Sequence, residues 1–68
     1  MKLQERMKEL RKERQETQLQ VALGVGITEH QYQRFEGGKQ KPGFDNFCAL
    51  ADHFGVSLDY LAGRTDER

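Results

Sequence analysis

The stretch 17-TQLQVALGVGITEHQYQRFEGGKQKPG-43 decides the fold, because helix-start signals and glycines divide it into short segments. A threonine followed three residues later by glutamine occurs at Thr17 and again at Thr28. In such a capping box the hydroxyl accepts a free backbone N–H of the first turn, and the glutamine side chain reaches back. Two short helices are therefore predicted close together, over 18–25 and 29–36.

Glycines predict where these two helices end. Gly26 suits the left-handed conformation that closes many helices, and Gly37 and Gly38 follow the second helix. Two short helices joined by a tight glycine turn form the helix-turn-helix arrangement. Within the first of them Gly24 is a poor helix residue, which costs about 1 kcal/mol relative to alanine.

The rest of the chain predicts three more helices, over 2–14, 44–54 and 58–62, because its apolar residues recur at spacings of three and four. No run alternates with the period of two that a strand needs. The predicted fold class is all-α, a compact five-helix bundle that contains the helix-turn-helix. One domain is expected over 1–63, followed by a flexible tail at 64–68.

Length and composition restrict the class of protein. The 68 residues make one domain at most, and the single cysteine, Cys48, excludes an internal disulfide and suits a reducing compartment. No apolar run approaches the roughly 20 residues of a membrane span, and the first residues lack the apolar core of a signal peptide. We therefore expect a cytoplasmic protein with no membrane partner.

The net charge is zero, but the charges are unevenly distributed. Residues 1–44 hold nine Lys and Arg against six Asp and Glu, a balance of +3. Residues 45–68 hold two against five, a balance of −3. A neutral total can therefore contain one basic and one acidic face.

The predicted helix 29–36 has one apolar face and one polar face. Tyr32 and Phe35 share a side and, with Ile27, can pack on the preceding helix. The other side offers hydrogen-bonding groups near the helix N-terminus, where backbone N–H groups and a partial positive charge also point outward. Such a helix end suits the DNA major groove, where it meets base edges. The alternative, for this helix alone, is an ordinary solvated surface.

The same stretch resembles the Cro/lambda-repressor type helix-turn-helix, also called the xenobiotic-response-element family of bacterial regulators. The resemblance continues through 50–66 and so covers nearly the whole chain. It is carried by residues of matching type at matching spacing, namely Thr17-Gln18, Val21-Ala22, Gly26-Ile27-Thr28, Tyr32, Phe35-Glu36, Gly38-Lys39 and Pro42.

The resemblance implies a bacterial or phage protein and three sets of contacts. Base-facing positions of the recognition helix correspond to Thr28, Glu29, His30 and Gln33. Positions that contact the DNA backbone correspond to Gln18, Arg34, Gly37, Gly38, Lys39 and Lys41. A partly buried ion pair that ties the first helix to the end of the third corresponds to Arg11 and Glu36.

Four positions depart from the family pattern. Glu16 stands where an aliphatic residue is usual and Gln15 where glycine often ends the first helix, so both concern the corner between the first two helices. Gly24 is unusual, and Gly37 lacks a side chain that often helps to hold phosphate. Glu29 could accept a hydrogen bond from cytosine N4, repel phosphate, or simply favour a helix N-terminus.

No pattern predicts catalysis, a metal site or a cofactor. The two histidines, His30 and His53, are not at metal-ligand spacing. Cys48 is expected to be a core thiol, and His53 a cation or surface residue at a helix end. The aromatic residues of the fourth helix are expected in the core: Phe44, Phe47 and Phe54.

The last helix is more apolar than a short terminal helix of a monomer needs. Leu58 and Tyr60 are candidates for a dimer contact, with packing inside the chain as the alternative. The first hypothesis is a homodimeric repressor that binds a near-palindromic operator in double-stranded DNA, without a small-molecule ligand. The second is a protein-interaction module, or an antitoxin-type partner-binding protein, with the same fold.

Overall fold

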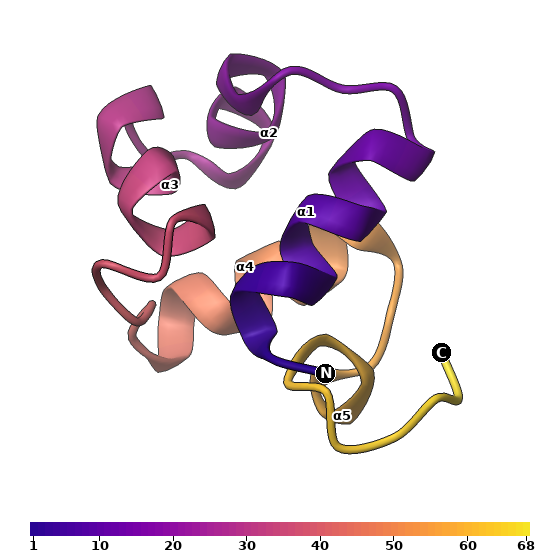
Figure 1. The fold of residues 1–68 in the computed structure, drawn as a ribbon. Helices are drawn as coiled ribbons and strands as arrows, with labels where there is room; N and C mark the ends of the chain where they lie inside the picture. The colour runs from indigo at the N-terminus through magenta and orange to yellow at the C-terminus, as the bar shows by residue number, and fades with distance from the viewer.

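The computed structural model describes all 68 residues and is entirely helical (Figure 1). The helices are α1 (Leu3–Glu13), α2 (Gln18–Val25), α3 (Glu29–Glu36), α4 (Phe44–Phe54) and α5 (Leu58–Leu61). The predicted all-α class is confirmed. α1 is one residue shorter at each end than its predicted range, and α5 is one residue shorter at its end. No helix is long and apolar enough to cross a lipid bilayer.

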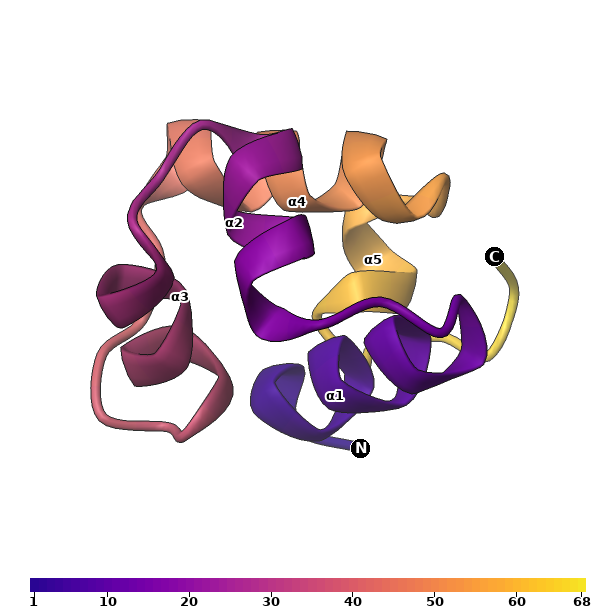
Figure 2. The same cartoon turned by 90° about the horizontal axis from the view of Figure 1, so that it is seen from above.

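The five helices enclose one small core. α1 and α4 lie on opposite sides of the molecule, α2 and α5 lie between them, and α3 lies at one end (Figure 2). Every helix contributes buried apolar side chains, since no single helix could bury enough surface alone. The core consists of Met7, Leu10, Val21, Ala22, Tyr32, Phe35, Leu50, Ala51, Phe54, Tyr60 and Leu61.

Side-chain caps set the starts of three helices. At Thr17 the capping box is complete, because its hydroxyl accepts the N–H of Gln20 and the Gln20 side chain accepts the N–H of Thr17. At Thr28 only half of the predicted box forms: the hydroxyl accepts the N–H of Gln31 at 3.1 Å, and the Gln31 side chain makes no return bond. Ser57 caps α5 in the same one-sided way.

The prediction that all three aromatic residues of α4 lie in the core is wrong for Phe44. Its side chain is 72% exposed, whereas Phe54 is buried and Phe47 is partly buried. Phe44 is the first residue of α4 and lies one turn before Phe47, where the packing of this helix against the core begins. Cys48 is only partly buried, because it lies beside the apolar face of α4 and not on it.

The corner between α1 and α2 explains three of the unusual residues. Gln15 has a left-handed backbone (φ +56°), so it supplies the turn for which glycine is more common. Glu16 turns inward, where both carboxylate oxygens lie 3.1 Å from Nε2 of His53 on α4, and one lies 2.8 Å from Nε of Arg14. Of the two alternatives predicted for His53, the surface residue is therefore wrong, since only 14% of its side chain is exposed, while its place in the last turn of α4 is as predicted.

Gly24 belongs to the same corner. A Cβ atom at this position would lie 2.6 Å from Cε1 and Nδ1 of the His53 imidazole, which is too close for any ordinary contact. The glycine therefore leaves the space that the His53 ring occupies between α2 and α4.

Partial burial raises the pKa of the Glu16 carboxyl, but hydrogen bonds from Arg14 and His53 outweigh it and bring that pKa below its usual value.

The end of the chain packs against α1 and α5. The Arg6 guanidinium lies 3.8 Å from the centre of the Tyr60 ring, and Arg68 lies over the same ring at 5.2 Å. Arg68 also pairs with both oxygens of Glu13, and its carbonyl accepts the N–H of Ser57. The predicted flexible tail thus includes a residue with defined partners.

Candidate nucleic-acid interface

The predicted recognition helix, α3, lies at one end of the molecule, away from α5 and the termini (Figures 1 and 2). Tyr32 and Phe35 fix its orientation, because their side chains are almost completely buried. This burial turns the other faces of the helix to solvent, including every residue that was predicted to meet DNA bases. Those exposed residues are Thr28, Glu29, His30 and Gln33.

Two of the predicted base-facing residues also stabilise the start of α3. The Thr28 oxygen accepts the N–H of Gln31, so its hydroxyl hydrogen remains free to donate to an acceptor outside the protein. Glu29 is in the first turn, where a carboxylate favours the helix dipole. His30 and Gln33 form no side-chain hydrogen bonds within the protein, and they are the side chains most available for base edges.

The loop after α3 folds back onto the last turn of that helix. The N–H groups of Lys39 and Gln40 donate to the Arg34 carbonyl at 2.9 and 3.2 Å, and Arg34 Nε donates to Gln40 Oε1 at 3.3 Å. Gly38 has the left-handed backbone (φ +76°) that this reversal requires. The loop therefore holds Lys39 and Lys41 beside α3, and both lysines are exposed and outside all ion pairs.

Gln40 has a structural role that the sequence did not predict. Its contact with Arg34 spans six residues and depends on the loop reversal, so no local pattern predicts it. Gly37 continues the helix conformation at φ −80° and has a Cβ position only 3.1 Å from the Gln33 carbonyl oxygen.

The structure brings Arg11 and Glu36 together as a two-pronged ion pair. Arg11 Nε and Nη2 lie 2.9 and 2.8 Å from the two carboxylate oxygens, and Nη1 donates to the carbonyl of Glu16. The pair is largely buried, with 14% of the Arg11 side chain and 5% of the Glu36 side chain exposed. It joins α1 to the end of α3, so Glu36 points inward and its charge is neutralised within the protein.

The ion pair sets the ionisation of both partners. Burial raises the pKa of Glu36, but the hydrogen bonds and the charge of Arg11 outweigh burial and bring that pKa below its usual value. The hydrogen bond to Glu36 raises the pKa of Arg11. Gln18, at the start of α2, lies 3.5 Å from the same carboxylate and is half-buried, so it too is held at the junction of α1, α2 and α3.

The two candidates for a dimer contact lie in different environments. Leu58 is 37% exposed on α5, whereas Tyr60 is 4% exposed and packs under Arg6 and Arg68. The alternative of packing within the chain therefore describes Tyr60, and Leu58 is the candidate on the surface. No group of three His, Cys, Asp or Glu side chains is placed to hold a metal ion.

Comparison with known proteins gives the same fold. The sequence pattern of a family described as "Helix-turn-helix domain" matches residues 4–67. The solution structure of the DNA-binding domain of the P22 C2 repressor superposes with a TM-score of 0.85 at 26% identity, over 90% of this chain and 80% of that domain.

Curated relatives are similar along almost all of this chain. The cryptic phage CTXphi transcriptional repressor RstR of Vibrio cholerae is 39% identical over 98% of the chain. The uncharacterised HTH-type transcriptional regulator YobD of Bacillus subtilis is 36% identical over 93% of it. The matched region spans only 62% of RstR and 56% of YobD, so both relatives are longer than the region they share with this chain.

Proposed function

Because the chain belongs to the helix-turn-helix domain family, we propose that it is a sequence-specific DNA-binding transcriptional regulator and that it acts as a repressor. One observation carries this proposal: the buried aromatic residues of α3 turn outward a polar face on which His30 and Gln33 have no partners in the protein, and two lysines outside all ion pairs lie beside it. The description of RstR as a transcriptional repressor supports the direction of regulation.

In this proposal α3 lies in the major groove of a double-stranded operator. Thr28, Glu29, His30 and Gln33 face the bases, because they surround the N-terminal half of the exposed helix. The DNA backbone is held by side chains on both sides of α3 and by close approach of the loop glycines. The N–H groups of Gly37 and Gly38 are not free for phosphate, because they donate to the carbonyls of Gln33 and Phe35. Those backbone contacts come from Gln18, Arg34, Gly37, Gly38, Lys39 and Lys41.

The proposed active form is a homodimer. Two copies of α3 would enter successive major grooves about 34–36 Å apart on a near-palindromic operator. A domain of 68 residues with few lysines and arginines at its interface gains from a second half-site, since each copy neutralises only a few phosphates. The exposed Leu58 on α5 is the proposed contact between the copies.

A protein-interaction module with the same fold is the second candidate function. The observations that favour it are the net charge of zero and the carboxylate of Glu29 on the proposed DNA-facing helix. An antitoxin-type protein that needs its partner before it binds DNA belongs to this class.

Selection from a random duplex library, with the purified chain and increasing salt, separates the two candidates. The proposed function predicts an enriched inverted repeat. It also predicts that the logarithm of affinity falls with the logarithm of salt, with a slope of about −0.9 for each phosphate neutralised. A folded helical protein that enriches no sequence at low salt would refute the proposal and leave the interaction module.

A further inference from the structure

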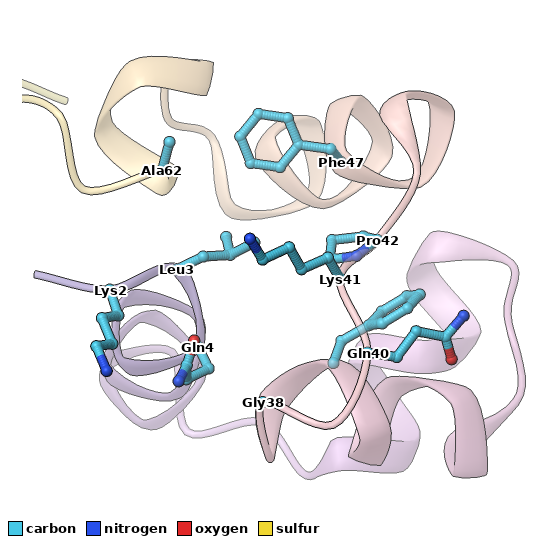
Figure 3. Close-up of a pocket in the computed structure, with 10 residues that line it drawn as sticks. Lys2, Leu3, Gln4, Gly38, Gln40, Lys41, Pro42, Phe47 and Ala62 are labelled. Carbon is cyan, nitrogen blue, oxygen red and sulfur yellow. The ribbon is translucent and has the colours of Figure 1, made fainter.

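A groove of about 640 Å³ opens between the start of α1, the loop after α3, the first turn of α4 and the end of α5 (Figure 3). Leu3, Pro42, Phe47 and Ala62 give it apolar walls, and Phe35 of the core also contributes. All four wall residues are partly exposed, so the groove presents apolar surface from three stretches distant in sequence: the start of α1, the loop with the first turn of α4, and the end of α5. Its volume is within the range of sites that bind ligands.

The charges around this groove have one sign. Lys2 and Lys41 are its charged lining residues, and no carboxylate lines it. Glu5 accepts the backbone N–H of Lys2, Glu36 is paired with Arg11, and neither lysine belongs to an ion pair. In Figure 3 the Lys41 side chain extends from the loop toward Leu3, so its aliphatic stem lies along the groove while its ammonium group remains solvated.

This combination of apolar walls and two unpaired ammonium groups selects a ligand that is both apolar and anionic. We propose that the groove binds a short segment of a partner protein that contains both acidic and leucine-like residues. A segment fits better than a small molecule because the groove is open, and an open groove cannot enclose most of a small ligand's surface. Carboxylates of the segment would meet Lys2 and Lys41 while its apolar side chains contact Phe47 and Ala62.

The proposed segment and DNA would compete. Gly38 and Lys41 line the groove and also belong to the proposed backbone contacts of DNA. One ammonium group cannot serve a ligand carboxylate and a DNA phosphate together, so an occupied groove would release the operator. This consequence rests on the proposed function, whereas binding of the segment does not.

The test is a titration of the isotope-labelled 68-residue chain, followed by the amide signals in NMR spectra, with no DNA present. The probe is an acetylated peptide of alternating aspartate and leucine. The expected result is saturable shifts at Leu3, Gln40, Phe47 and Ala62. Equal shifts from a matched aspartate–serine peptide, shifts on another face, or no shifts at millimolar peptide would overturn the proposal. Equally tight binding of hexanoate would also overturn it, in favour of a small ligand.

Two variants connect the shifts to the groove. Ala62→Glu should weaken binding of the aspartate–leucine peptide by more than about tenfold, because it adds a repelling carboxylate and removes an apolar contact. Lys41→Glu should weaken it by about fivefold, and the matched exposed lysine variant Lys12→Glu by less than about twofold. Each variant must retain the helical circular dichroism of the parent. If folded Ala62→Glu binds the peptide as tightly as the parent, the groove is not the peptide-binding site.

A second experiment tests the competition with DNA. The aspartate–leucine peptide should displace the parent chain from its selected operator. It should fail to displace Ala62→Glu, whose predicted DNA contacts are intact. If no operator is found, the proposed function fails while the NMR titration still decides the groove. If an operator is found and both proteins stay bound to it at saturating peptide, the competition is refuted.

Discussion

Gly24 and His53 provide the sharpest test of how α2 is positioned. In the parent protein a Cβ at Gly24 would lie 2.6 Å from the imidazole, whereas ordinary contacts begin near 3.4 Å. The ring would have to move by about 0.8 Å to restore an ordinary contact, and a close-packed interior leaves little space for such a shift. The ring is held from the far side, because Nε2 lies 3.1 Å from both oxygens of Glu16 and its edge packs on Phe54.

The magnitude follows from two opposing effects. The ring cannot move closer to Glu16, whose oxygens already lie 3.1 Å from Nε2, so it must swing aside and lose this hydrogen bond. The bond is worth about 1.5–3 kcal/mol because the acceptor is charged. Alanine gains about 0.5–1 kcal/mol over glycine in a helix. Gly24→Ala should therefore lower the free energy of unfolding by about 1–2 kcal/mol, which lowers Tm by about 4–15 °C in a domain of this size.

The effect should change sign when the ring is absent. In a His53→Ala background nothing obstructs a Cβ at position 24, so Gly24→Ala should raise the free energy of unfolding by about 0.5–1 kcal/mol. The difference between the two backgrounds is a coupling energy of about 2 kcal/mol. Urea unfolding of the four proteins, followed by circular dichroism, measures it. If Gly24→Ala has the same sign and size in both backgrounds, the ring swings away freely and the reasoning fails.

Three further predictions concern the interface and its support. Gln33→Ala should reduce the discrimination against a wrong base pair at one operator position by about 1–3 kcal/mol. Lys39→Ala should weaken binding to all duplexes alike and reduce the slope of affinity against salt by about 1. Fluorescence anisotropy titrations with operator variants measure both effects, and similar effects of the two variants on base preference would contradict the assigned roles. Glu36→Gln should lower the free energy of unfolding at pH 7 by about 2–3 kcal/mol, because it leaves a largely buried arginine without its countercharge. Because the folded-state pKa of Glu36 is lowered, its contribution is complete above the ordinary carboxyl pKa of 4.5 and is lost as pH falls through the folded-state pKa. The parent should therefore lose more stability in acid than Glu36→Gln, and parallel losses would contradict this. Leu58→Asp should convert the dimer to monomer in analytical ultracentrifugation without lowering Tm, because Leu58 is on the surface. Tyr60→Ala should lower Tm, because it removes a buried ring. A dimer unaffected by Leu58→Asp would contradict the proposed contact.

The fold class was predictable because the signals that specify it are local. Thr17 and Gln20 define a helix start within four residues, and the periodicity of Tyr32 and Phe35 fixes which side of α3 is buried. Such patterns depend on backbone geometry that repeats every few residues. Phe44 shows what such periodicity does not specify: it places a residue on a face of the helix but does not say where along the helix the core ends.

The corner formed by Glu16, Gly24 and His53 could not be predicted for a different reason. Each of the three is unfavourable or uninformative alone: a carboxylate where an aliphatic residue is usual, a glycine inside a helix, and a histidine near a helix end. They become consistent only when α2 and α4 are placed side by side, since the glycine accommodates the ring and the carboxylate binds it. A contact between residues 37 positions apart leaves no pattern in a single sequence.

The loop after α3 joins the two proposed activities through one set of residues. Its backbone N–H groups and the Arg34–Gln40 contact fix the loop against α3, which favours DNA binding because less order remains to be gained on binding. Lys41 and Pro42 of the same loop form one wall of the groove. Thermodynamic reciprocity then requires equal effects in both directions. If the bound partner segment lowers the affinity for DNA by some factor, bound DNA lowers the affinity for the segment by the same factor. An operator-bound regulator would therefore resist its partner most strongly at its tightest operators, and release would begin at the weaker ones.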